Sequence, residues 1–513
     1  MSQQSKIRLN AVDRIVAFLS PAAGVRRLAA RNVLNQYEAA KPSRLRKGAK
    51  DHRPPNAQVQ QGALALRGLA RNLEQNHDIA RGALRTLVNN VVGPNGIGIE
   101  PQPRRKNGQI HEEYATALRK AYRDWQQNPE VTQKHHWNKV QRLVAKTWLR
   151  DGECFAQRLI GAVPLLDHAT LVPYSLELIE PDLIPLDHHD VGRRIRQGVE
   201  SNTWGKPTAY WAYKDYPGET YSSRSYELKR IDATRMHHIA SLDRIGQMRG
   251  VSEFASVITR LEDIKDYEES ERVAAKVAAS LTAYVKKGSP EDFSAPGADG
   301  EDKGPRELHF APGMIIDSLG AGEEIGMIDS NRPNPNLVTF RQGQLRAVAA
   351  GLGGSYSSIA RDYSGTYSSQ RQELVEQWTH YAVLCDEFVG QFVQPVWKDF
   401  VLAANLSGVV PMPRDVDPET MDDALFVGQS MPWIDPYKEA QAWHMLVQDG
   451  FASEVEVMRK RGANPRDVLE QILTHREECK KKGLVFGSDY GNSKSTPPAP
   501  ASTPPDEEEE KEE

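Results

Sequence analysis

At residues 241–254 the sequence reads SLDRIGQMRGVSEF, a polar stretch with two glycines and two arginines. Short β-rich runs come before it, and the strongest helical pattern of the chain comes after it. A glycine-rich loop beside arginines could cradle a phosphate, or it could serve as a hinge. The stretch contains no nucleophile motif, metal box or phosphate loop. The rest of the chain therefore has to decide between the two interpretations.

The region before this stretch predicts a mixed body of helices and strands. Helical patterns run from Asn56 and include residues 111–127 and 137–150. Between residues 153 and 240 the period changes to short runs divided by Gly, Pro and Asp, namely ECFAQRLI, SLELIEP, TAYWAYK and TRMHHIA. This order predicts an α+β body with a mostly antiparallel sheet.

The region after the stretch predicts a helical stalk with a small tip. Ser252 is a good N-cap for a helix over residues 252–287, and a second helix is expected over 336–351. Between them, GMIIDSLGAGEEIGMID at 313–329 is typical of two short strands around a Gly-rich turn. A stalk out, a β tip and a stalk back fit this order.

Helical patterns continue to the end of the folded part. Ser369 and Gln372 predict a capping box for a third long helix, in which Pro395 predicts a kink. Asp435 as N-cap and Pro436 at the first helical position then begin three short helices. The segment beyond about residue 487 is rich in Ser, Pro and Glu, which predicts disorder.

Charge is distributed unevenly along the 513 residues, although the net charge is only −4. Up to Arg53 twelve Lys and Arg oppose three acids, a balance of 12 − 3 = +9, whereas residues 506–513 (DEEEEKEE) carry seven acids and one lysine. Nothing resembles a signal peptide or a membrane-spanning run, so we expect a soluble chain that is intracellular at synthesis. The amphipathic segment 7–20 could lie on a membrane, but docking on its own protein is the simpler interpretation.

Catalytic and metal sites are not expected. The cysteines Cys154, Cys385 and Cys479 are odd in number and far apart, so they imply no disulfide framework. Vicinal histidines on a strand point to opposite faces, so one pair rarely supplies two ligands to one metal. We predict no catalytic residue, metal or cofactor. The enzyme alternative is a metal-dependent nuclease that uses the acidic and histidine side chains Asp182, Asp187, His188, His189 and Asp190.

The long helix is acidic, with six acids against three bases between residues 260 and 272. The plain interpretation is a solvated helix face. The functional interpretation is a surface that repels phosphate, because a conduit for moving DNA must avoid gripping it. The candidate lining residues are Glu262, Asp263, Asp266 and Glu269.

Motifs spread from about residue 60 to residue 480 resemble tailed-phage portal proteins of the lambda-like type. GALRTLVNNVVGPNGIGIEP resembles the N-terminal motif of that family, and WLRDGECFAQRL, LELIEPDLI and GVESNTWGKPTAYWAY resemble its sheet region. RIGQMRGVSEF resembles the junction before the first stem helix. LRAVAAGLGGSYSSIARDYSGTYSSQR is the strongest match, and the segment from residue 434 to 468 is similar to the C-terminal region.

The resemblance implies a portal fold with an α/β wing, a long helical stem, a small β-containing clip and a helical crown. Its parts would be a basic arm at 1–55, the wing at 56–250, the stem helices at 251–288 and 334–354, the clip at 289–333, a tunnel loop at 355–369, a long helix returning to the wing at 370–430, the crown at 431–487 and a disordered acidic tail at 488–513.

The resemblance also implies a function and partners. Copies would form a ring, most often of twelve subunits, at one capsid vertex of the virion, after assembly in the host cytoplasm. Double-stranded DNA would pass through without sequence recognition, driven by the terminase large subunit. Capsid, scaffolding, head-completion and tail adaptor proteins would be further partners. The loop residues facing DNA would be Arg361, Tyr363, Ser364, Gly365, Tyr367 and Arg371, which in a monomeric enzyme would form an ordinary loop. A filament or scaffold protein with the same stalk is another alternative.

Overall fold

The computed structural model describes residues 16, 18–23, 26, 52–218, 226–279, 283–287, 323–327, 336–431 and 435–484. The chain divides into two units, Met1–Pro54 and Pro55–Glu513. In the first unit the described residues are mostly helical. The elements below belong to the second unit. Within the described ranges, no helix has the length and apolar character needed to cross a membrane.

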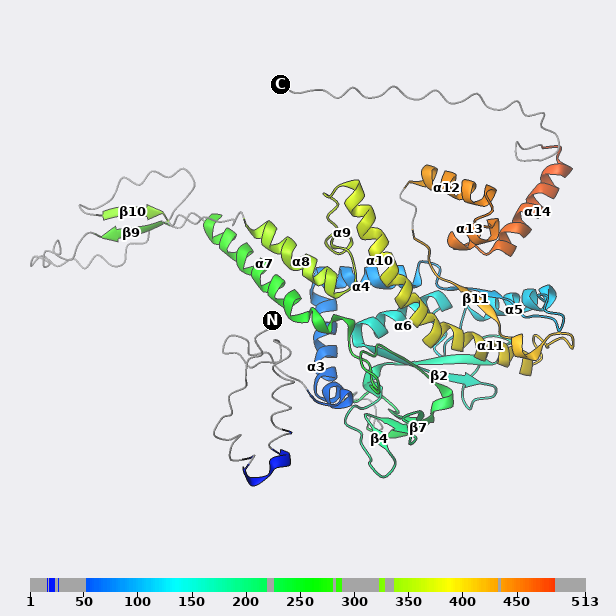
Figure 1. Cartoon of the computed structure of the whole chain (residues 1–513), viewed down its shortest axis with the longest axis horizontal. Helices are drawn as coiled ribbons and strands as arrows, with labels where there is room; N and C mark the ends of the chain where they lie inside the picture. The colour runs from blue at the N-terminus through cyan, green and yellow to red at the C-terminus, as the bar shows by residue number, and fades with distance from the viewer. Residues whose placement is uncertain are drawn as a thin grey trace, which may run out of the picture. The chain divides into compact units, whose positions relative to one another are not determined.

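Helices come first in the second unit and cover one side of a sheet (Figure 1). Helix α6, Trp137–Asp151, packs against helices α3 and α4 and against the first strand of the sheet, so it forms the centre of this layer. The helices expected over 111–127 and 137–150 are confirmed, as α5 and α6. The bounds are α3 Pro55–Asn76, α4 Asp78–Val92, α5 Glu112–Trp125 and α6 Trp137–Asp151.

Two antiparallel sheets follow, which confirms the expected α+β class. One sheet has three strands in the order β3-β2-β8, with β2 Glu153–Ile160, β3 Tyr174–Ile179 and β8 Met236–Ala240. A four-stranded sheet has the order β4-β5-β6-β7, with β4 Ile195–Arg196, β5 Val199–Ser201, β6 Pro207–Tyr213 and β7 Leu228–Asp232. Two short 3₁₀ turns, η2 Pro181–Leu183 and η3 Ala233–Arg235, connect them.

Strand β2 lies between two hydrophobic cores because its side chains alternate between faces. Cys154 and Ala156 belong to the large core against the helices, whereas Phe155 belongs to a smaller core shared with the four-stranded sheet. The large core is aromatic: the rings of Trp125 and Tyr174 stack at 5.3 Å. Buried aromatic side chains contribute large apolar areas, so they hold the helical layer on the sheet.

The stalk is helical but shorter than predicted. A 3₁₀ turn, η4 Glu253–Ser256, precedes helix α7 Ile258–Ala279, and helix α8 Leu337–Gly351 returns. The expectation of α8 is confirmed, but a single helix over 252–287 is wrong, because Ala283–Lys287 form strand β9. Tyr and Val favour strands, and a distant partner strand satisfies their backbone groups.

That partner strand is β10, Glu323–Met327, which pairs antiparallel with β9. The sequence predicted that two strands within 313–329 would pair with each other. For Glu323–Met327 this is wrong, because its partner is β9; residues 313–322 lie outside the described part. The register places Glu323 opposite Lys287 and Glu324 opposite Lys286. Opposite charges at facing positions stabilise a strand pair, which a helix prediction could not anticipate.

The third long helix is confirmed, with two corrections. Helix α10 runs over Tyr367–Phe388, and its N-cap is Thr366, whose hydroxyl accepts from Ser369 N at 3.4 Å. The predicted capping box from Ser369 is therefore one turn late. Instead of a kink at Pro395, a π-helical turn, η6 Val389–Val393, precedes the proline. The neighbouring helices are α9 Tyr356–Ala360 and α11 Gln394–Leu406.

The C-terminal helices attach to the body through ion pairs at a small two-stranded sheet. Strand β1, Gly98–Pro101, pairs antiparallel with β11, Ala424–Val427, after the 3₁₀ turn η7 Pro418–Thr420. Arg459 donates to Glu100 at 3.2 Å on this sheet. The three short helices are confirmed, as α12 Pro436–Gln448, α13 Glu454–Lys460 and α14 Pro465–Lys481, and Asp435 caps the first as predicted.

Candidate nucleic-acid interface

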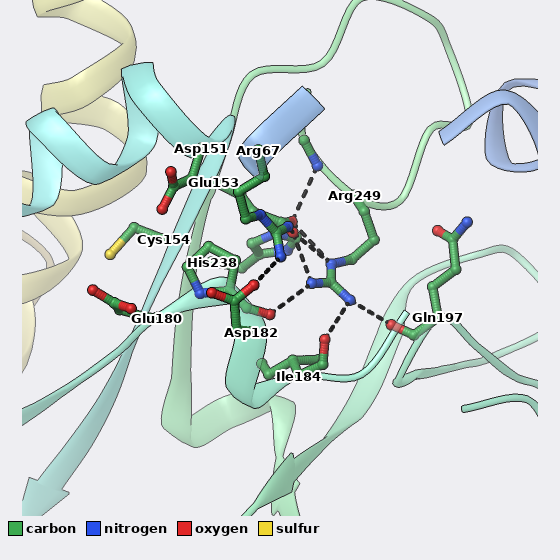
Figure 2. Close-up of polar contacts among 12 residues, drawn as sticks. Arg67, Asp151, Glu153, Cys154, Glu180, Asp182, Ile184, Gln197, His238 and Arg249 are labelled. Atoms are coloured by element: carbon green, nitrogen blue, oxygen red, sulfur yellow. Dashed lines mark hydrogen bonds and ion pairs between the residues drawn. The ribbon is translucent and has the colours of Figure 1, made fainter. Parts of the chain in front are cut away.

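The stretch at 241–254 is built around Arg249, which is fully buried. Its Nε donates to both carboxylate oxygens of Glu153 at 2.9 Å, and its terminal nitrogens donate to the carbonyl oxygens of Ile184, Gln197 and Pro181. Figure 2 shows these contacts converging on one guanidinium. An arginine with so many internal partners is a structural tie and is not available to bind a phosphate.

Glu153 joins Arg249 to the helical layer. Arg67 of α3 donates to Glu153 at 3.1 Å and to Asp182 at 2.8 Å, and the His238 ring lies 3.0 Å from the other oxygen of Glu153. Burial alone would raise the pKa of Glu153, but the charges of Arg249 and His238 outweigh it and hold that pKa well below its ordinary value. The carboxylate is therefore ionised inside the protein.

Two glycines, Gly152 and Gly250, allow two backbone segments to approach each other closely beside Glu153. A Cβ on Gly250 would lie 2.0 Å from the carbonyl oxygen of Gly152, and Gly152 has φ +90°. Ser241 N donates to that same carbonyl oxygen at 2.8 Å. Only glycine fits such a close backbone approach. Of the two initial interpretations, the phosphate cradle is wrong, and the stretch is an anchored junction between the sheets and the stalk.

The stalk is an antiparallel helix pair with one packed face and one exposed face. Leu261 and Ile264 of α7 are buried in the same core as Leu345 and Val348 of α8, and the Tyr267 ring meets the edge of Phe340 at 4.9 Å. The packed face is closed further by Arg260, which donates to Gln344 at 2.8 Å, and by an ion pair between Glu268 and Arg341.

The acidic candidates lie mostly on the exposed face. Asp263, Asp266 and Glu269 are exposed at three-residue spacing, whereas Glu262 is half-buried. Residues three apart on a helix are neighbours, so the three carboxylates form one acidic stripe along α7. The sequence identified the correct helix, and the structure separates its exposed acids from the ones that pack.

The loop between α9 and α10 is shorter than expected and is ordered by its own side chains. Residues 356–360 are helical, so the irregular part spans only 361–366. Ser364 N donates to Asp362 at 3.1 Å, and Tyr356 donates to the same carboxylate at 2.8 Å. Gln370 donates to the carbonyl oxygen of Tyr363 at 2.6 Å. Asp362 and Gln370 were not predicted from the sequence, although Asp two residues before Ser364-Gly365 is a common turn signal.

The six loop candidates are not equivalent in the structure. Tyr363 and Tyr367 are more than half exposed, at 59% and 56%. Ser364, Gly365 and Arg371 are also exposed. Arg361 has a left-handed φ of 56°, and its guanidinium reaches Thr86 of α4 at 3.3 Å. The loop therefore presents two tyrosines and Arg371 to its surroundings, while Arg361 also lies against the body.

The residues of the enzyme alternative are engaged separately. Asp182 pairs with Arg67 and Arg71, His189 accepts from Gln197 N at 3.3 Å, and Asp190 accepts from Gly192 N at 2.8 Å in a turn. Across the ranges that the structure describes, no three His, Cys, Asp or Glu side chains are grouped so that they could hold a metal ion.

One expectation about histidines is confirmed. His237 and His238 on strand β8 point to opposite faces: His237 lies 2.9 Å from Asp399 of α11, and His238 lies against Glu153. Neither these carboxylate partners of the histidines nor the ion pair of Glu153 with Arg249 was predicted from the sequence. The stretch around β2 holds several charged and polar residues besides Glu153, so no distinct signal in the sequence marks this buried pair.

Comparison with known proteins decides the family. The family model for phage portal proteins of the lambda family matches residues 41–384, which is more than half of the chain. This protein belongs to the lambda family of phage portal proteins. The portal chain is 26% identical over 444 residues to a probable portal protein of Halomonas phage phiHAP-1, and this match covers 83% of this chain and 82% of the relative.

A second relative agrees with this family. The portal chain is 23% identical over 473 residues to portal protein B of Escherichia phage lambda, covering 84% and 87% of the two chains. Among solved structures it is similar to a chain described as the neck of a native GTA particle computed with C12 symmetry, with a TM-score of 0.40, 12% identity and coverage of 80% of this chain and 99% of the other. The protein is thus a phage portal, a head-tail connector component of a structural family.

Proposed function

We propose that copies of this portal chain form a ring, most simply of twelve subunits, around a channel for double-stranded DNA. The observation that carries the proposal is the α7–α8 pair, whose packed face is apolar and whose other face bears Asp263, Asp266 and Glu269. In a ring this acidic stripe would repeat around the channel. Because it repels phosphate, it would let the duplex slide without a strong grip.

The loop at 361–366 and the start of α10 would make the direct contacts with DNA. Tyr363, Tyr367 and Arg371 are exposed there, together with Ser364 and Gly365. Arginine and tyrosine can both donate to phosphate oxygens, and such contacts position a duplex without reading its bases. Arg361 would contribute charge from the edge of the loop, since it also contacts Thr86. The role is guidance or retention of DNA and not catalysis.

The remaining parts would serve assembly. The sheets and helices of 56–250 would form the wing, and the long helix of 370–430 would return to it. Residues 289–333, which include β10, would form the clip together with the adjacent strand β9. An isolated two-stranded ribbon is marginally stable, so strands of neighbouring subunits would complete it. The terminase large subunit and the tail adaptors would dock on the clip. The basic arm at 1–55 would contact capsid or scaffolding proteins.

The crown, residues 431–487, would gain its core from neighbouring subunits. Within α12 and α13 no described side chain is buried. Phe451 is 79% exposed, and Leu473 of α14 is 55% exposed. Large apolar side chains gathered on exposed helices mark an interaction surface. Ring closure requires such a heterologous contact between different faces of adjacent copies.

Electron microscopy of the purified chain tests this proposal. We expect rings with a central hole, and we expect the double change Phe451→Asp and Leu473→Asp to shift most of the protein from rings to smaller species at equal concentration. The matched control, Lys134→Glu with Lys139→Glu, changes exposed side chains outside the crown and should leave rings intact. A wild-type chain that stays monomeric at every concentration would refute the ring. Intact rings of the apolar-to-acidic variant would refute the role of the crown.

A further inference from the structure

A basic cleft lies between the β4–β6 region, strand β8 and the loop at 242–248. Its volume is about 1020 Å³, and it is lined by residues that include Arg194, Arg196 and Trp204. None of the portal roles proposed above uses this cleft. It is built from parts of the fold that Arg249 and its partners hold in place.

The cleft has an excess of unpaired positive charge. The side chains of Arg194 and Arg196 are exposed and form no ion pair within the described ranges. Lys206, between the lining residues Gly205 and Pro207, is exposed, whereas Arg193 pairs with Asp190 at 3.9 Å and Glu200 pairs with Arg230 at 3.0 Å. Asp190 lines the cleft, but its carboxylate accepts from the backbone of its own turn. Within the described ranges an anion would therefore meet Arg194 and Arg196 without a paired carboxylate, while Asp190 is paired with Arg193.

The rim of the cleft also has the composition of a protein-binding site. Trp204 is 92% exposed, Val191 is 95% exposed and Leu242 is 54% exposed. Trp and Arg are enriched among the residues that carry binding energy at interfaces. Apolar side chains beside arginines favour a peptide over a nucleic-acid backbone, which would gain little from the valine and leucine.

We infer that the acidic segment 506–513 of this chain docks in the cleft. Seven of its eight residues are acids, so it complements the exposed Arg194, Arg196 and Lys206. It follows a Ser- and Pro-rich stretch, and the 21 residues between positions 484 and 506 can span roughly 70–75 Å when extended. Tethering raises the effective concentration into the millimolar range, so even a weak contact would be occupied.

The chain offers a second basic partner, the arm up to Arg53, with its balance of 12 − 3 = +9. The cleft is the better receptor because its arginines are carried by folded strands and turns, so binding costs less ordering of the receptor. Arg194 itself has a left-handed φ of 55°, and Ser201 N donates to its carbonyl oxygen at 3.3 Å, which fixes the backbone from which it projects.

A peptide titration tests the inference on the full-length chain. The seven acids of 506–513 are changed to Asn and Gln to free the cleft, and a labelled peptide of residues 502–513 is added while its fluorescence anisotropy is measured. We expect saturable binding that weakens with salt. Arg194→Glu with Arg196→Glu should weaken it at least tenfold. Arg81→Glu with Arg85→Glu, an equal charge change at exposed positions of α4, should leave it unchanged.

Three results would overturn the inference. The first is equal affinity of the cleft variant and the α4 control. The second is loss of peptide binding when residues 1–53 are removed, which would make the basic arm the receptor. The third is equal peptide affinity of the unmodified chain and of the chain with the neutralised segment, since a docked segment must compete with the added peptide. None of these results depends on ring formation, so the outcome is separate from that of the portal proposal.

Discussion

Replacing Glu153 with glutamine is expected to lower the free energy of unfolding by about 3–5 kcal/mol, because it leaves buried arginine without its counter-charge. Arg249 and Arg67 are both almost fully buried, with side chains 0% and 2% exposed, and both donate to this carboxylate. Glutamine keeps the shape but supplies one oxygen and no charge. The measurement is the urea concentration at which half of the protein unfolds.

The control for this change is Glu200→Gln. Glu200 also pairs with an arginine, Arg230, at 3.0 Å, but that arginine is exposed. Surface ion pairs contribute only about 0–1 kcal/mol, so the control should shift the midpoint little. Equal shifts of the two variants would contradict the assignment of the junction as a buried electrostatic tie.

Acid should weaken the same tie. The pKa of Glu153 is lowered in the folded chain: burial raises it, but Arg249 and His238 outweigh burial. Its contribution to stability is therefore complete above its unfolded pKa of about 4.3 and is lost as the pH falls toward the folded value. Asp182, which pairs with Arg67 and Arg71, has a lowered pKa for the same reason and acts in the same direction. We expect the unfolding midpoint to drop below about pH 4, and to drop less steeply in Glu153→Gln.

Reversing the charge of the loop between α9 and α10 should give the largest functional effect. With Arg361→Glu and Arg371→Glu together, the loop would carry acids where it now carries bases, at the surface proposed to face DNA. Contacts with phosphate are repeated around a ring, so small losses multiply. We expect assembly and terminase ATPase activity to persist while the yield of particles that hold a full genome falls roughly tenfold. The measurement is the length of DNA protected from nuclease in assembled particles.

The matched control for the loop is Lys134→Glu with Lys139→Glu, which makes the same charge change at exposed positions outside the loop. Its particles should retain DNA normally. If the loop variant packages and keeps full-length genome at the rate of the control, the loop does not face DNA in the proposed way. If assembly itself fails, the loop is part of a subunit contact.

Local sequence patterns were sufficient wherever neighbours in the chain decide the structure. Asp435 followed by Pro436 begins a helix because a cap and a fixed φ act within one turn. The apolar spacing of α8 is likewise local. The order of the parts and the motifs spread from about residue 60 to residue 480 allowed the portal family to be identified before any contact was known.

Contacts between distant residues could not be read in the same way. Residues 283–287 continue a helical pattern, yet they form a strand because Glu323–Met327 supply a partner with facing opposite charges. Glu153 and Arg249 are 96 residues apart and meet only when β2, η2 and the junction fold together. The sequence by itself determined most of the helices, the order of the parts and the family, because periodicity and motifs are local. Only the tertiary structure decided which charges are buried in pairs and which, such as Arg194 and Asp263, remain free to bind or repel a partner.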